Sequence, residues 1–125
     1  MDPKEFEALI DEVLKDLPKD FKRRLENITV MVENEPSKEV YKRMGIPRSH
    51  VLFGLYHGVP YPHRGPFYGN IPPDVIVIYQ KPIERNSSSM QDMKNKVREV
   101  VIHEIGHYFG FDEAALRKIE KERQG

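Results

Sequence analysis

The sequence predicts a compact α+β domain, in which a small mixed sheet of about three strands packs with an N-terminal helix, a long helix and a short C-terminal helix. Two patterns predict this class. Apolar residues recur every three or four positions near both ends of the chain, and they alternate or run together in short segments between those ends. With 125 residues and 38% hydrophobic content, the chain can build one ordinary core, so we expect a single domain over residues 1–125.

The first segment is predicted to be an amphipathic helix over residues 3 to 17. Asp2 and Glu5 have the spacing of a capping box, and Pro18 cannot continue a helix. The apolar residues of the segment fall on one face, which we expect to be buried: Phe6, Leu9, Ile10, Val13, Leu14 and Leu17.

Three strands are predicted in the middle of the chain. Residues 28–33 alternate between apolar and exposed types, which is typical of a half-buried strand. A short helix over 37–44, closed by Gly45, separates it from a second strand over 51–56. Residues 75–79 are apolar throughout, so we expect them to form the central strand.

The long helix is predicted to begin at Ser88 or Ser89, either of which can cap it, and to carry an apolar stripe as far as Tyr108. Gly110 fits the end of this helix. Asp112 can cap a last short helix.

Residues 57–73 are rich in proline, glycine and aromatic residues, and we expect them to form an ordered, exposed loop. Loops of this length often form lids or binding rims. Tyr61, Arg64 and Tyr68 are candidates for binding substrate or stabilising an oxyanion, although packing within turns is the more frequent role of such residues.

Composition excludes several classes of function. The chain has no cysteine, so disulfides, thiolate metal ligands and cysteine nucleophiles are excluded. Lys plus Arg equal Asp plus Glu at 20 each, which gives no sign of a nucleic-acid or membrane partner. The acidic, amphipathic N-terminus does not resemble a signal peptide, so we expect a cytoplasmic protein.

A metal-binding motif lies on the long predicted helix. His103, Glu104 and His107 form H-E-x-x-H, and two imidazoles four residues apart on one helix face can ligate the same zinc ion. Glu104 is placed to act as the catalytic base that takes a proton from an attacking water. The alternative is that these residues are ordinary, hydrogen-bonded members of a helix.

The third metal ligand has several candidates. Glu113 follows His107 by six residues, and we favour it over Asp112, whose side chain also suits the N-cap of the last helix. His57 and His63 could contribute from the proline-rich loop, although a surface imidazole is the more frequent role of a lone loop histidine.

Residues 53–60, 73–83 and 100–110, together with the motif, resemble a family of small bacterial zincin-like proteins with the pattern H-E-x-x-H-x-x-G-x-x-D. The resemblance extends from about Leu25 onward. It implies a compact minimal zincin-like fold and metallopeptidase activity, with His103 and His107 as zinc ligands and Glu104 as general base. The chain departs from the pattern at Glu113, which stands where the family has aspartate and has a longer reach.

The same region also resembles bacterial zinc endoribonucleases of rRNA maturation, which have H-G-x-x-H-x-x-G-x-D-H. Gly110 and Asp112 match that run, but Glu104 and Glu113 do not, and both differences favour a peptidase. The sequence therefore predicts a one-zinc hydrolase that acts on a peptide or protein substrate. A non-catalytic metal-binding or interaction module and a zinc endoribonuclease are the alternatives.

Overall fold

The computed structural model describes residues 1–26, 28–57 and 74–108, which form five helices and three strands. The elements follow one another along the chain as α1 (Pro3–Lys15), α2 (Lys19–Leu25), β1 (Ile28–Glu33), α3 (Lys38–Met44), β2 (Gly54–His57), β3 (Asp74–Tyr79), α4 (Gln80–Arg85) and α5 (Met90–Tyr108). The predicted α+β class is confirmed.

The strands form one mixed sheet in the order β1-β3-β2. β1 runs parallel to β3 with Val30 opposite Ile76, and β2 runs antiparallel to β3 with Tyr56 opposite the same residue. The prediction that residues 75–79 form the central strand is confirmed. Five of the six residues of β3 are buried, as expected for a strand paired on both sides and covered on both faces.

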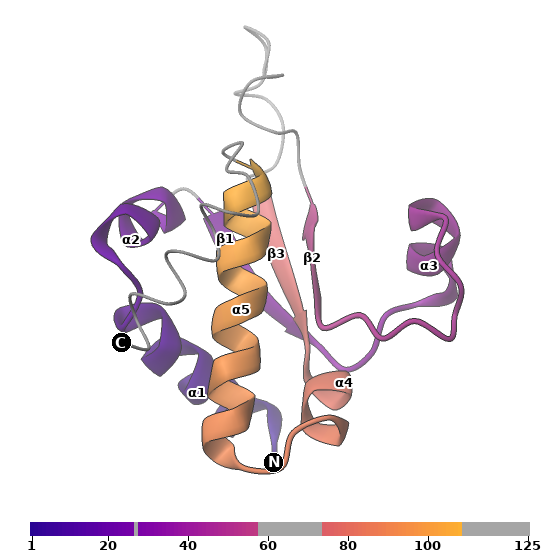
Figure 1. Ribbon diagram of the computed structural model, residues 1–125, viewed down its shortest axis with the longest axis horizontal. Helices are drawn as coiled ribbons and strands as arrows, with labels where there is room; N and C mark the ends of the chain where they lie inside the picture. Colours follow the sequence, from indigo (N-terminus) through magenta and orange to yellow (C-terminus); the bar gives the residue numbers. More distant parts are fainter. Residues whose placement is uncertain (27, 58–73, 109–125) are drawn as a thin grey trace, which may run out of the picture.

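α1 and α5 lie against one face of this sheet, and Figure 1 shows α5 running across it. Helix and sheet side chains meet there in one continuous core, because α1 and α5 each turn an apolar stripe inward. The fully buried members of this core are Phe6, Phe21, Ile76, Ile78, Ile83, Val97, Val101, Ile102 and Ile105.

A smaller cluster covers part of the opposite face of the sheet. Leu55, Val77 and Tyr79 are buried there, and Val40 of α3 and Leu52 pack against them half-buried. α3 itself has no buried residue, so it contributes little to the core.

The predicted helix signals are observed at several helix ends. The Asp2 carboxylate accepts a hydrogen bond at 2.8 Å from the backbone N–H three residues later, and Gly45 ends α3 with a φ of 66°. At the start of α5, the Ser89 hydroxyl accepts from the Asp92 N–H at 3.0 Å, while the Asp92 carboxylate accepts from the Ser88 N–H at 3.0 Å. Both serines therefore take part in the cap.

The structure differs from the sequence-based prediction at several element boundaries and contains two helices that were not predicted. α1 ends at Lys15 and not at residue 17, although Leu17 is still buried. β2 begins at Gly54 and not at residue 51, and the helices α2 and α4 were not predicted. The predicted helix end at Gly110, the cap at Asp112 and the last short helix lie outside the described residues. No helix in the described part of the chain has the length and apolar character needed to cross a membrane.

Candidate metal centre

α5 carries the whole H-E-x-x-H motif in regular helical conformation. Positions 103 and 107 are therefore one turn apart on the same side of the helix, as a pair of metal ligands requires. The side chains of His103 and Glu104 are half-buried. Each is therefore partly covered by the protein and partly accessible to solvent. The helical prediction on which the motif depends is confirmed.

The ring of His103 is oriented by its own helix. Its Nδ1 atom lies 2.9 Å from the backbone carbonyl oxygen of Glu99, one turn earlier. Because a carbonyl oxygen can only accept, Nδ1 must be the protonated nitrogen in this hydrogen bond. The neutral ring then has its lone pair on Nε2, and such a hydrogen bond is typical of a metal-ligating histidine. Sequence patterns alone did not reveal this role of the Glu99 carbonyl.

The motif faces the β2 side of α5. A Cβ atom on Gly54 of β2 would clash with the Val100 side chain and lie 2.9 Å from the Val77 carbonyl oxygen, so the backbone of the strand packs directly against a side chain of the helix. His103 and Glu104 follow Val100 by three and four residues, which places them on the same side of the helix. A glycine inside an apolar strand is the sequence signal that could have predicted this approach.

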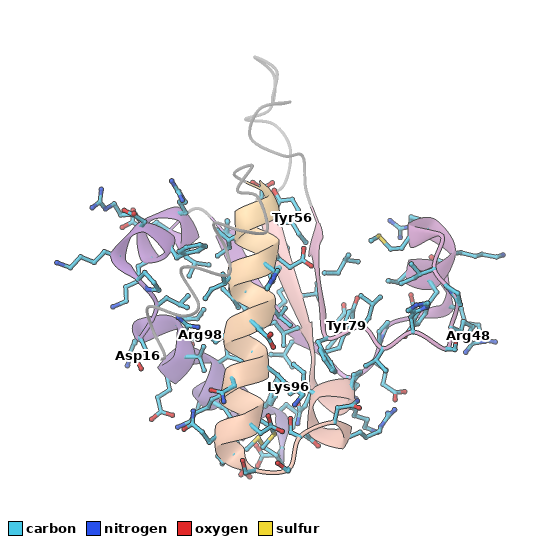
Figure 2. All side chains as sticks on the ribbon, in the orientation of Figure 1. Asp16, Arg48, Tyr56, Tyr79, Lys96 and Arg98 are labelled. Atoms are coloured by element: carbon cyan, nitrogen blue, oxygen red, sulfur yellow. The ribbon has the colours of Figure 1, made fainter. Side chains whose placement is uncertain are left out.

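β2 and α5 run in the same direction and reach the same end of the molecule (Figure 1). Tyr56 lies beside the C-terminal end of α5, as Figure 2 shows, and it packs half-buried against the main core. The strand therefore forms one wall beside the stretch of helix that carries the motif.

Several predicted site residues cannot be placed. Glu113, Asp112 and His63 lie outside the described residues, as do Tyr61, Arg64 and Tyr68. His107 and His57 are described as members of α5 and β2, but their side chains are not. Within residues 1–26, 28–57 and 74–108, no group of three or more His, Asp or Glu side chains could hold a metal ion, so the choice of third ligand stays a prediction.

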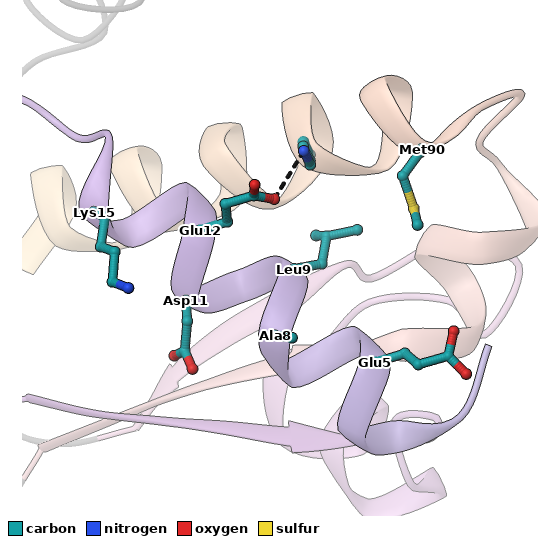
Figure 3. A pocket seen from close by; sticks show the side chains of 8 residues that line it. Glu5, Ala8, Leu9, Asp11, Glu12, Lys15 and Met90 are labelled. Atoms are coloured by element: carbon teal, nitrogen blue, oxygen red, sulfur yellow. Dashed lines mark ion pairs between the residues drawn. The ribbon is translucent and has the colours of Figure 1, made fainter.

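A separate pocket of about 530 Å³ lies between α1 and the start of α5 (Figure 3). Met90 and Lys94 line it from α5, and Lys94 pairs with Glu12 of α1 at 2.8 Å. These residues belong to the first two turns of α5, whereas the motif occupies the last two. This pocket is therefore not part of the candidate metal centre.

Fold and motif define a small α+β protein built around an H-E-x-x-H helix. The chain belongs to the zincin-like metallopeptidase family, whose model matches residues 25–123, and the family resemblance seen in the sequence is confirmed. A conserved hypothetical protein from Thermus thermophilus has a similar fold, with a TM-score of 0.56, 23% sequence identity, and coverage of 86% of this chain and 92% of that one. No curated protein matches the chain.

Proposed function

We propose that this protein is a zinc-dependent metallopeptidase that hydrolyses peptide bonds in a peptide or protein substrate. The observation that carries the proposal is the orientation of His103, whose Nδ1 donates to the Glu99 carbonyl oxygen 2.9 Å away, as the non-ligating nitrogen of a metal-bound histidine commonly does. Membership of the zincin-like metallopeptidase family supports the same conclusion.

The donor set fits zinc. Imidazole nitrogens and carboxylates are usual zinc ligands, and a pair of histidines on one helix face is a common arrangement. His103 and His107 would hold the ion together with Glu113. Bound zinc supplies Lewis acidity, which polarises a peptide carbonyl and makes water acidic enough to lose a proton near neutral pH.

Glu104 has the role of general base. It follows His103 directly, so its carboxylate starts from the flank of the metal-binding face and is not required as a ligand. In this position it takes the proton of the attacking water and passes it to the leaving amine. The side chain of Glu104 is half-buried, so solvent can still reach the carboxylate that carries out both transfers.

We further propose that the protein acts in the cytoplasm, without a nucleic-acid or membrane partner. The balanced charge of the chain argues against nucleic-acid and membrane partners.

The decisive experiment compares the zinc content and the peptidase activity of the wild-type chain with those of Glu104→Gln. Zinc is measured by mass spectrometry of the purified protein, and activity on a diverse peptide library. We expect Glu104→Gln to retain stoichiometric zinc and to lose activity by at least about a hundredfold. Glu39→Gln, which removes an exposed carboxylate from α3, is the matched control and should leave both unchanged.

Two outcomes of this experiment would favour a different function. Stoichiometric zinc without cleavage of any peptide would favour a non-catalytic metal-binding module. Cleavage of RNA but not of peptides, abolished by the same variant, would favour an endoribonuclease. Full peptidase activity in Glu104→Gln would contradict the assigned base.

A further inference from the structure

β1 is an edge strand of the sheet that the described residues form. It pairs with β3 on one side only, so its outward backbone N–H and C=O groups can pair with another strand. Edge strands are usually guarded by lysine, proline or a bulge. β1 carries none of these along its six residues, and its central Met31 is 46% exposed.

A groove of about 410 Å³ runs between this edge and α1. We call it the edge groove. Its β1 wall is made by Val30, Met31 and Val32. Its α1 wall is a single helical stripe at spacings of three and four, which consists of Glu7, Ile10, Asp11 and Leu14.

The α1 wall has an apolar base and an acidic rim. Ile10 is buried and Leu14 half-buried, whereas Glu7 and Asp11 are exposed. Figure 3 shows Asp11 pointing away from α5, on the opposite side of α1 from Glu12. Glu12 is paired with Lys94 of α5 and does not line the edge groove, whereas Glu7 and Asp11 do. Asp11 also lines the pocket between α1 and α5.

We propose that the edge groove binds an extended peptide in which basic and apolar residues alternate, by strand addition to β1. In an added strand, successive side chains point to opposite faces of the sheet. Lysine or arginine on the α1 side would lay its aliphatic stem along Ile10 and Leu14 and bring its charge to Glu7 and Asp11. Apolar residues on the other side would cover Met31.

The acidic rim argues against a second copy of this chain as the occupant. Antiparallel pairing of two β1 edges would continue the sheet and place both α1 helices on the same face. The Glu7 and Asp11 side chains of the two copies would then face each other across the junction. Like charges in that position disfavour self-pairing and favour a basic partner.

The test is a titration of the isotopically labelled full-length chain with a short blocked peptide of alternating lysine and valine, followed by NMR. We expect backbone shifts confined to residues 28–33 and 7–14, and binding that weakens as salt is raised. Two peptides serve as controls. One replaces each lysine with glutamate and the other has proline at its centre, and neither should bind, because the first has the wrong charge and the second lacks a central N–H.

Variants of the protein make the test specific. Met31→Lys should weaken binding at least about tenfold, because an edge lysine guards against strand addition, whereas Met44→Lys is the matched control on α3, where Met44 is 48% exposed. The double variant Glu7→Gln/Asp11→Asn should weaken binding roughly fivefold, as expected for two exposed ion pairs. Glu26→Gln/Glu39→Gln removes the same charge elsewhere and should have no effect.

The inference fails if the lysine peptide does not bind, if the glutamate peptide binds equally well, or if the shifts appear away from β1 and α1. It also fails if sedimentation shows a dimer that Met31→Lys dissociates, because a second copy would then occupy the edge. Binding here needs neither zinc nor Glu104, so the result is independent of the proposed peptidase activity. Mass spectrometry of the peptide after the titration confirms that it stayed intact.

Discussion

Gly54 of β2 and Val100 of α5 are packed so closely that the glycine has no room for a methyl group. We predict that Gly54→Ala destabilises the fold by about 1–3 kcal/mol, the usual cost of overpacking. This cost outweighs the smaller loss of backbone entropy on folding that alanine has in a strand compared with glycine. Urea denaturation measures the change.

Val100→Ala is the partner variant, because it removes the Cγ1 atom with which the new methyl group clashes. The effect of Gly54→Ala should be smaller in the Val100→Ala background than in the wild type. Gly45→Ala provides the control. It should also destabilise the fold, since Gly45 has a φ of 66°, but Val100→Ala should not alter its effect. Strict additivity of the Gly54 and Val100 variants would show that the crowding is not real.

Tyr79 is fully buried, and its hydroxyl has no hydrogen-bond partner among the described residues. We therefore predict that Tyr79→Phe leaves the free energy of unfolding unchanged or raises it by up to about 1 kcal/mol, because no bond is lost and a buried polar group is removed. Thermal unfolding at neutral pH measures this. A loss of stability like that of a core truncation would mean that the hydroxyl has a partner.

The raised pKa of Tyr79 should make the stability of the fold depend on pH in the alkaline range. Burial raises the pKa of Tyr79, and the nearby Glu33 carboxylate raises it further. Above the unfolded-state pKa of about 10, the unfolded chain loses the phenol proton that the folded chain retains. The stabilisation from this group is thus complete below about pH 10 and is lost as pH rises through the folded-state pKa. Tyr79→Phe should flatten this alkaline loss of stability, which thermal unfolding at a series of alkaline pH values measures.

Asp92 should make stability sensitive to acid. The pKa of Asp92 is lowered, chiefly because its carboxylate accepts from the Ser88 N–H and also because it contacts Lys96. The ionised Asp92 carboxylate therefore stabilises the fold fully at pH values above its unfolded-state pKa of about 3.9. This stabilisation is lost as the pH falls through the lower pKa that Asp92 has in the folded state. Asp92→Asn should therefore lower the melting temperature at neutral pH and weaken its fall in acid. Glu39→Gln controls for the change in net charge, and an unchanged acid profile in Asp92→Asn would contradict the prediction.

The metal ligands can be ranked by zinc affinity, measured in competition with a chelator. His103→Ala and His107→Ala should each weaken zinc binding at least about a hundredfold, since even residues that only orient ligands contribute ten- to a hundredfold. Glu113→Gln should weaken binding more than Asp112→Asn does. The reverse order would assign Asp112 as the third ligand, and equal, small effects would point to a loop histidine or water.

Periodicity predicted the elements whose burial is regular. α1, β1, β3 and α5 each present an apolar face or run to the core, and pattern reasoning relies on such burial. The short helix α2 has a single buried residue, Phe21, among charged neighbours, so no stripe marks it. α4 follows β3 with no intervening turn and contains Pro82, which reads as a helix breaker although it lies in the first turn, where a missing N–H is tolerated.

The candidate site was predictable to a similar degree. Spacing alone placed the motif of His103 and His107 on one helix, because an i, i+4 pair on a helix is a local relationship. The contact that orients the His103 ring involves a backbone carbonyl, and the contact that sets β2 beside the motif joins residues far apart in the sequence. The carbonyl contact has no residue-type signature in a single chain, and the glycine at position 54 indicates a close approach without identifying Val100 as the partner.

The order of the strands limits when this protein can fold during its synthesis. β1 and β2 leave the ribosome first, but they are not neighbours in the sheet, and within residues 1–26, 28–57 and 74–108 each pairs with β3 alone. Until residues 74–79 emerge, the two earlier strands lack the partner that joins them in this sheet, and the apolar face of α1 lacks part of the surface against which it packs. A nascent chain stalled before β3 should therefore expose unpaired strand edges to chaperones, and cooperative folding should begin only after the central strand is available.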